Sequence, residues 1–174
     1  MGENLLEVYN AISINQVKSD VAFRTLVEGV NEHMYVIPEY QRKFRWSKKK
    51  IENLAISLIK GLPIPPIYTY RNDENQLEVL DGQQRIISLF LYFYGKIVES
   101  EQSPFFDYQS LELGEETFLE ALERKKLLVD CIYKMSVDDD EYDISYARLP
   151  KKLQRKVDYM PITIVEIKIG SEEN

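Results

Sequence analysis

The sequence predicts an α/β domain of the α+β type, in which a small mixed sheet with flanking helices is followed by an elaborated C-terminal half. Segments in which apolar and polar residues alternate are interspersed with segments of helical period. A length of 174 residues corresponds to about one domain and is long enough for a real core. The apolar fraction of 44% and the charged fraction of 29% are those of an ordinary globular protein. We therefore expect a single domain over residues 1–174.

The first half of the chain, about residues 12–95, carries the clearest periodic patterns. Ser47 is a favourable N-cap for a helix, and Gly61 and Pro63 end the helical pattern that follows it. A polar turn at residues 72–75 separates two strand-like runs, as in a hairpin. The expected elements of this half are a short strand near residues 12–17, a helix from about 20 to 32, a helix after Ser47, strands at 67–70 and 76–80, and a helix that ends near Tyr94.

The second half, about residues 96–174, has weaker patterns and is expected to elaborate the domain. Residues 99–114 contain Pro104 and no clear period, which indicates an irregular insertion. Residues 127–133 are compatible with a helix or a strand, and their alternation favours a strand. The remaining expected elements are helices at 115–124 and 149–158 and a strand at 161–169.

Composition excludes several classes of function. The net charge of −7 argues against a nucleic-acid-binding surface dispersed over the molecule. The single cysteine, Cys131, excludes an internal disulfide, and the single histidine, His33, excludes a histidine-rich metal nuclease site. His33 is expected near the end of a helix. No apolar run approaches the roughly 18 residues that span a bilayer, and the N-terminus lacks the features of a signal peptide. We therefore expect no membrane partner and a cytoplasmic location.

The most informative motif is Leu-Asp-Gly-Gln-Gln-Arg-Ile at residues 80–86, between a strand-like and a helical segment. Asp81 is expected to be the N-cap of the helix, with Gln84 at N3 as in a variant capping box. Such caps are common, so a purely structural role stays open. Gly82 allows a ligand to approach the backbone closely, and Arg85 adds a cation to the first turn. A glycine and an arginine at a helix start suit an anionic ligand.

A second motif, Ile-Pro-Glu-Tyr-Gln-Arg-Lys-Phe-Arg-Trp, occupies residues 37–46 and has no hydrophobic period. One interpretation is a basic loop that its aromatic residues anchor to the core. In the functional interpretation, Gln41 and Arg42 point inward beside the first motif while the aromatic residues fix their position. We then expect Arg42 and Arg85 to converge on one cleft, which also exposes the carboxylate or the glycine amide of the strand-helix turn.

The two motifs, in this order and with Gly-Leu-Pro-Ile-Pro-Pro-Ile at residues 61–67 between them, resemble the ParB/sulfiredoxin-like superfamily. More narrowly, they resemble the N-terminal domain of GmrSD-type, modification-dependent restriction systems. The resemblance covers about residues 12–95 with specific motifs and continues more loosely through 149–153 and 162–169. Relatives usually carry a histidine-containing nuclease domain after this one. One histidine cannot supply it, so the sequence is expected to be either the N-terminal domain without that nuclease domain, which we favour, or a stand-alone relative.

The resemblance implies a regulatory domain of a DNA-restriction and phage-defence system. The resemblance implies that such a domain binds a nucleotide, hydrolyses a nucleoside triphosphate, and acts with a separate nuclease domain or subunit. Arg42 and Arg85 would neutralise the triphosphate, because arginine suits bidentate phosphate contacts, and Tyr40 and Gln41 would lie beside them. Backbone amides from Gly82 onward would surround a phosphate at the helix start.

The catalytic candidates in this scheme are Asp81, Gln83 and Gln84. Asp81 would hold Mg²⁺ or act as a base towards an attacking water, and one of the glutamines would orient that water. A carboxylate close to phosphates is repulsive without a metal. A divalent ion is therefore implied if Asp81 faces the ligand.

A second interpretation is a nucleic-acid-binding module without catalysis of its own. Residues 42–50 contain six basic residues and no acid, with aromatic residues interleaved, which suits single-stranded or flipped bases. A further basic run at 148–156 is explained by a charged helix face, and the acidic run at 138–141 by a solvated loop. A third interpretation is a scaffold in which the motifs only stabilise the fold. The candidates for nucleic-acid binding are Arg45, Trp46, Lys48, Lys49 and Lys50.

Overall fold

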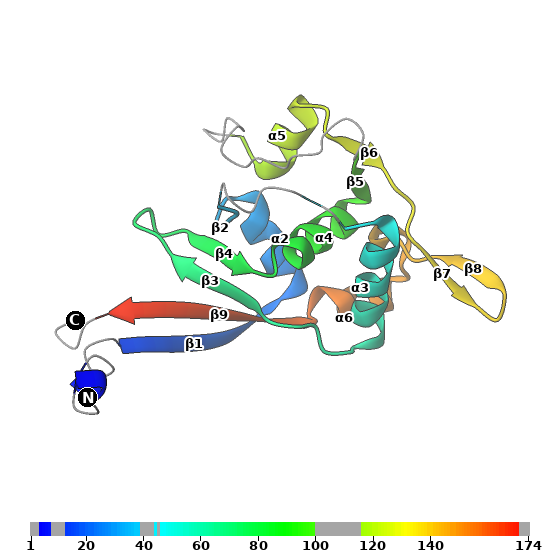
Figure 1. Ribbon diagram of the computed structural model, residues 1–174. Helices are drawn as coiled ribbons and strands as arrows, with labels where there is room; N and C mark the ends of the chain where they lie inside the picture. The colour runs from blue at the N-terminus through cyan, green and yellow to red at the C-terminus, as the bar shows by residue number, and fades with distance from the viewer. Residues whose placement is uncertain (1–3, 8–12, 39–43, 45, 100–115, 171–174) are drawn as a thin grey trace.

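A computed structural model describes residues 4–7, 13–38, 44, 46–99 and 116–170. At its centre lies a five-stranded sheet with the order β1-β9-β3-β4-β2 (Figure 1). The strands of this sheet are β1 (Ser13–Ala22), β2 (Tyr35–Val36), β3 (Ile67–Arg71), β4 (Leu77–Asp81) and β9 (Pro161–Gly170). The main helices are α2 (Phe23–Asn31), α3 (Lys48–Lys60), α4 (Gln83–Tyr94), α5 (Phe118–Arg124) and α6 (Lys151–Asp158). The predicted α+β class is confirmed.

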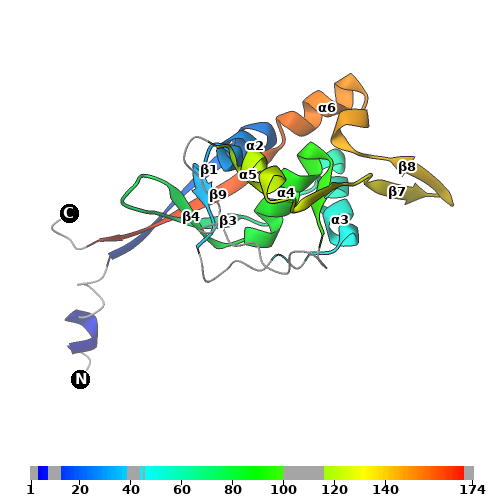
Figure 2. The same cartoon turned by 90° about the horizontal axis from the view of Figure 1, so that it is seen from above.

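The sheet mixes parallel and antiparallel pairs. Strands β1 and β9 pair antiparallel along their whole length of 10 residues, and β9 pairs parallel with β3. Strands β3 and β4 form an antiparallel hairpin, and β4 pairs parallel with β2. The hairpin predicted at residues 67–70 and 76–80 is therefore confirmed. Because β3 meets β9 only at residues 164–166, the outer parts of β1 and β9 run beyond it, away from the helices (Figures 1 and 2).

Helix α4 forms the middle of the hydrophobic core. Residues 86–92 are all buried, so this helix is enclosed on nearly every side. Its Phe90 ring meets Phe118 of α5 edge to face at a centroid distance of 5.2 Å. The helix ends as predicted at Gly95, which adopts the left-handed conformation with φ 64°. The start of α4 is thereby held firmly between the sheet and the other helices.

The C-terminal half adds two small antiparallel pairs and a basic helix. Burial raises the pKa of Tyr92 and of Tyr133 far above the usual value for a phenol. Both hydroxyls donate hydrogen bonds of 2.6 Å, Tyr92 to the Ile144 carbonyl and Tyr133 to the Lys96 carbonyl. The first bond joins α4 to the C-terminal half, and the second lies within that half. Its additional elements are β5 (Lys96–Val98) with β6 (Leu128–Asp130), β7 (Lys134–Val137) with β8 (Asp140–Asp143), and a 3₁₀ turn at Tyr146–Arg148.

The first strand and the first helix depart from the predicted boundaries. The helix expected from Asp20 begins at Phe23, because residues 20–22 pair with residues 161–163 of β9. The first strand is correspondingly longer than predicted. Pairing with a strand from the far end of the chain prevailed here over the local helical period.

Other predictions hold with shifted ends. In the strand expected at residues 127–133, only Leu128–Asp130 pairs, and the helices expected from 115 and 149 begin at Phe118 and Lys151. His33 follows the end of α2, as expected, and its Nε2 lies 2.7 Å from the Glu116 carbonyl oxygen. Within the described residues, no helix combines the length and apolarity needed to cross a membrane.

Candidate functional site

The first sequence motif lies at the junction of β4 and α4. Strand β4 ends at Asp81, which pairs with Tyr68 across the hairpin, and α4 begins at Gln83. Gly82 lies between them as the N-cap, with φ 99° and ψ 14°, and no side chain caps the helix. The prediction that Asp81 is the N-cap, with Gln84 completing a capping box, is therefore wrong. The ladder holds Asp81 in the strand, and the chain turns one residue later at the glycine.

Gly82 is enclosed by Arg85 and by the start of β3. A Cβ atom at position 82 would lie 3.1 Å from Arg85 Nη2 and 3.2 Å from Ile67 Cγ1, both closer than ordinary van der Waals contact. Arg85 Nη2 donates a hydrogen bond of 2.8 Å to the Pro66 carbonyl oxygen. The guanidinium group therefore folds back against the glycine turn and spans from α4 to the segment that precedes β3.

Two polar atoms beside this turn are buried without a hydrogen-bond partner, namely Gln83 Oε1 and Arg85 Nε. A buried unpaired polar atom costs about 1–3 kcal/mol, so such atoms are rare and call for an explanation. The first turn of α4 also carries backbone amides that no side chain caps. One unpaired donor, Arg85 Nε, and one unpaired acceptor, Gln83 Oε1, thus lie at the start of a helix that no side chain caps, where the helix dipole favours an anion.

The other residues of the motif have different surroundings. Asp81 is exposed at the end of β4, and Gln84 is half-buried in the first turn of α4. The described parts of the chain contain no group of three or more His, Cys, Asp or Glu side chains that could hold a metal ion. Among the described residues, the turn therefore offers the single exposed carboxylate of Asp81 and no complete set of protein ligands for a metal ion.

The second motif is only partly described by the structure. Tyr40, Gln41, Arg42 and Arg45 lie outside the described residues, so the convergence of Arg42 with Arg85 stays a prediction. Trp46 is half-buried just before α3, and Lys50 Nζ lies 5.8 Å from the centroid of its ring.

Ser47 is the N-cap of α3, as predicted, and its side chain accepts a hydrogen bond from the Lys50 amide. Lys48, Lys49 and Lys50 are exposed in the first turn of the helix. Cations are disfavoured at this end by the helix dipole. This cluster is the described part of the basic and aromatic segment.

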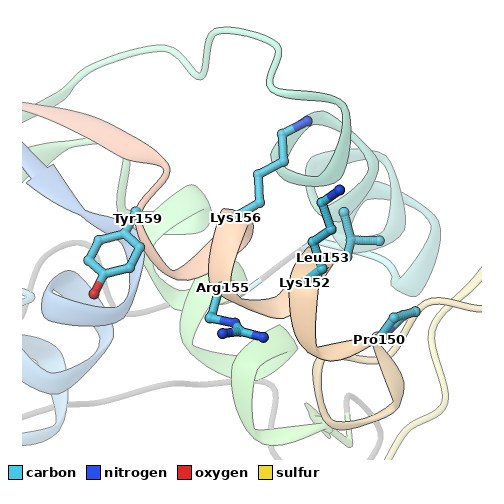
Figure 3. A pocket seen from close by; sticks show the side chains of 6 residues that line it. All are labelled: Pro150, Lys152, Leu153, Arg155, Lys156 and Tyr159. Carbon is cyan, nitrogen blue, oxygen red and sulfur yellow. The ribbon is translucent and has the colours of Figure 1, made fainter.

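A feature that sequence interpretation missed lies along α6. An open hollow of about 820 Å³ is lined by Pro150, Lys152, Leu153, Arg155, Lys156 and Tyr159. Figure 3 shows the three cationic side chains extending from the helix, with Pro150 at one end and Tyr159 at the other. The basic run at 148–156 had been explained as a solvated helix face. Tyr159, a large aromatic residue that is 78% exposed, distinguishes this hollow from an ordinary solvated helix face.

The fold and the turn define an α+β domain in which the enclosed central helix, α4, begins at Gly82, and the guanidinium group of Arg85 packs against this glycine. A protein-family model described as the GmrSD restriction endonuclease, N-terminal domain, matches residues 23–172. The chain belongs to this family, as its motifs indicated. Neither the curated proteins nor the solved structures contain a match to the chain. Strand β1 lies before the matched segment, which includes the sheet strands β2, β3, β4 and β9 and both candidate surfaces.

Membership of this family makes the chain a component of a restriction system, and it implies a companion nuclease domain. The wider ParB/sulfiredoxin-like assignment stays a prediction. The same holds for the roles of the individual site residues.

Proposed function

We propose that the turn between β4 and α4 binds a nucleoside triphosphate, and that the domain hydrolyses it to control the companion nuclease. One observation carries the proposal: the uncapped start of α4 lies beside two buried polar atoms, Gln83 Oε1 and Arg85 Nε, that have no partner. A phosphate at this turn would accept from the backbone amides and from the guanidinium group. Because Gly82 has no side chain, the Arg85 guanidinium group can lie directly against the turn, where a phosphate would meet it.

Asp81 and the glutamines would supply the chemistry. Mg²⁺ is commonly bound by one or two carboxylates together with substrate phosphates and water, so a single exposed carboxylate fits it. Asp81 would hold the ion, which would neutralise charge on the phosphates, and Gln83 or Gln84 would orient the attacking water. Asp81 does not cap α4, so its carboxylate is not needed to stabilise the start of the helix.

A nucleotide thermal-shift screen with and without Mg²⁺ tests binding. A ligand at 100 times its Kd stabilises the folded protein by about 2.7 kcal/mol, which a melting curve detects readily. Arg85→Ala also removes the hydrogen bond to Pro66, so the informative quantity is the ligand-dependent shift rather than the melting temperature itself. The apparent affinity for the triphosphate, obtained from that shift, should fall at least tenfold, since a charge-assisted contact contributes about 1.5–3 kcal/mol. No triphosphate-dependent shift in the wild-type protein would refute the proposal.

Arg71→Ala is the matched control for the arginine variant. Arg71 lies at the opposite end of β3 and donates to the Glu166 carboxylate at 2.7 Å, so this variant also removes an arginine with a partner. It should retain the full ligand-dependent shift. An equal loss in both variants would mean that general destabilisation, rather than a phosphate contact, caused the effect.

Hydrolysis is tested by Asp81→Asn. The variant keeps the shape of the side chain and removes the charge needed for metal coordination or proton abstraction. Turnover, measured as phosphate release with the companion nuclease present, should fall by at least tenfold while binding changes less. Full turnover in a folded Asp81→Asn protein would exclude the catalytic role of this carboxylate.

A second candidate function is nucleic-acid binding by the start of α3. The observation that favours it is the placement of Lys48, Lys49 and Lys50 where the helix dipole disfavours cations, next to Trp46. A bound phosphate backbone would compensate this arrangement, and an aromatic ring would stack on a base. Single-stranded DNA in the same thermal screen discriminates the two functions: stabilisation by DNA alone, lost in Lys49→Glu, supports this candidate over the first.

A further inference from the structure

Two surfaces of the C-terminal half carry opposite charge and are largely exposed within the described structure. The first is the hairpin of β7 and β8, residues 134–143, which we call the acidic arm. It contains five acidic residues and one lysine. The second is the hollow along α6, which we call the basic groove, and it is lined by Lys152, Arg155, Lys156 and three uncharged residues. Each surface has an apolar part as well as a charged one.

The acidic arm is a preformed and exposed hairpin. Its two turn residues, Asp138 and Asp139, have φ angles of 50° and 69°, the left-handed conformation that the most favourable two-residue hairpin turn requires. Figures 1 and 2 both show the arm extending away from the helices. Asp138 and Asp139 therefore present their carboxylates at the tip of a projecting element.

One face of the arm carries two exposed apolar side chains, Val137 and Tyr142, while Met135 on the same face packs against the core of the domain. Met135 lies opposite Tyr142 in the register and Val137 opposite Asp140, so these four side chains share a face. Tyr142 is 51% exposed and Val137 is 44% exposed. A single two-stranded hairpin is marginally stable in water unless its apolar face packs against another element. Because only Met135 packs against its own domain, Val137 and Tyr142 are left for a second molecule to cover.

The basic groove has the complementary character. Its apolar parts are Pro150, Leu153 and the exposed ring of Tyr159. Residues 148–156 contain five cations and no acid. Within the described part of the chain, neither Lys152 nor Lys156 forms an ion pair.

We propose that the acidic arm of one copy of this chain binds the basic groove of a second copy, and reciprocally, in a symmetric dimer. The charges match, since the arm is acidic and the groove basic. The lengths match too: four residues of β8 span about 13 Å and the eight residues of α6 about 12 Å. The apolar side chains of the arm would cover Leu153 and Tyr159. Each contact forms twice because the two subunits are identical.

Nucleic acid is the competing occupant and fits less well. A phosphate backbone would meet the cations but would leave the apolar floor of the groove uncovered. The proposed dimer uses neither Arg85 nor Gly82, so its test does not depend on the proposed nucleotide site.

The oligomeric state in solution tests the proposal. Light scattering or sedimentation over a concentration series should show a dimer at low salt. The dimer should dissociate in about 1 M salt, where the Debye length is only about 3 Å.

Two charge-reversed proteins sharpen the test. The groove-reversed protein carries K152E, R155E and K156E. The arm-reversed protein carries D140K and E141K with D138N and D139N, because asparagine tolerates the left-handed turn that lysine would strain.

Each reversed protein should be monomeric alone, because its arm and groove then carry the same sign of charge. An equimolar mixture should form a heterodimer, because each arm then meets a groove of opposite charge. Far-ultraviolet circular dichroism verifies that both proteins are folded. The pairing of the mixture is a gain of function that unfolding cannot imitate. As a further variant, Y142S should weaken the wild-type dimer without changing any charge.

Three results would overturn the proposal: a monomeric wild type at about 100 μM, which is far above a typical specific Kd; a dimer unaffected by groove reversal; or a mixture that fails to pair. A monomer whose binding to labelled duplex DNA is abolished by groove reversal would assign the groove to nucleic acid instead.

Discussion

The replacement of Gly82 by alanine tests how the turn between β4 and α4 is built. A residue with a Cβ pays about 1–2 kcal/mol to adopt the left-handed conformation found there. The added atom would also lie 3.1 Å from Arg85 Nη2 and 3.4 Å from the backbone Cα of Ile67. Displacing the guanidinium group adds about 0.5–1.5 kcal/mol of rotamer strain. Loss of its hydrogen bond to Pro66 adds about 1 kcal/mol. We expect a total loss of about 2.5–4.5 kcal/mol in the free energy of unfolding.

Gly95→Ala is the matched control, because Gly95 ends the same helix in the same conformational region. Its φ is 64°, and an added Cβ would meet only the Cys131 carbonyl oxygen, at 3.8 Å. The control should therefore cost only the backbone contribution of about 1–2 kcal/mol. Urea denaturation followed by circular dichroism gives both values. Equal losses in the two variants would refute the close packing of Arg85 and Ile67 on Gly82.

Three further predictions concern other parts of the molecule. Lys49→Glu should raise the free energy of unfolding by about 0.3–1 kcal/mol, and Lys60→Glu should lower it by a similar amount. The helix dipole favours an acid at the N-terminal end of α3, where Lys49 lies, and a cation at the C-terminal end, where Lys60 lies. Changes of the same sign in urea denaturation would contradict this. Tyr133→Phe should cost about 1–3 kcal/mol, because it leaves the Lys96 carbonyl without its donor. Burial raises the pKa of Tyr133, so the stability that the neutral hydroxyl contributes is complete below about pH 10, the pKa of an unfolded tyrosine, and should shrink at higher pH. If the difference in unfolding free energy between wild type and Tyr133→Phe stayed constant up to about pH 11 in urea denaturation, the effect would be excluded. Burial also raises the pKa of the Cys131 thiol, so an aromatic disulfide reagent should react slowly with it at neutral pH and rapidly in urea; equal rates would be inconsistent with burial.

The elements that could be predicted from the sequence are those specified by neighbouring residues. The hairpin around Asn72–Asn75 follows from polar turn residues between two alternating runs, and Asn72 does close it, accepting from the Gln76 amide at 2.9 Å. Helix α3 follows from Ser47 and Gly61, which form its two caps as expected. In both cases the controlling interactions span a few residues.

The failures have long-range or one-residue causes. Residues 20–22 carry a helical period, but their pairing with β9 decides their conformation, and no local pattern reveals a partner at the opposite end of the chain. Asp81 is a favourable cap by type, but its pairing with Tyr68 in the ladder moves the cap to Gly82. The basic groove was missed because a solvated helix face and a groove have the same sequence pattern, and only the structure shows the hollow.

For the candidate site, the sequence placed residues 81–85 together because they are contiguous. It did not show that Arg85 reaches back to the Pro66 carbonyl, since that contact depends on the position of β3 beside α4. The unpartnered atoms of Gln83 and Arg85 likewise follow from tertiary packing and have no counterpart in sequence spacing.

The position of β9 has a consequence for how the protein folds during synthesis. Among the described strands β9 is made last, yet it lies between β1 and β3. The Thr69 hydroxyl donates to the Val165 carbonyl 96 residues further along the chain, and the Thr163 hydroxyl donates to the Asp20 carboxylate 143 residues before it. Contacts of such separation form slowly, because the intervening chain must first be ordered.

Before residues 161–170 leave the ribosome, one edge of β3 is open and β1 has no strand to pair with in the described sheet. Open strand edges are the usual templates for aggregation. The yield of folded protein is therefore expected to depend on how quickly β9 inserts after synthesis, more than on the stability of the finished sheet.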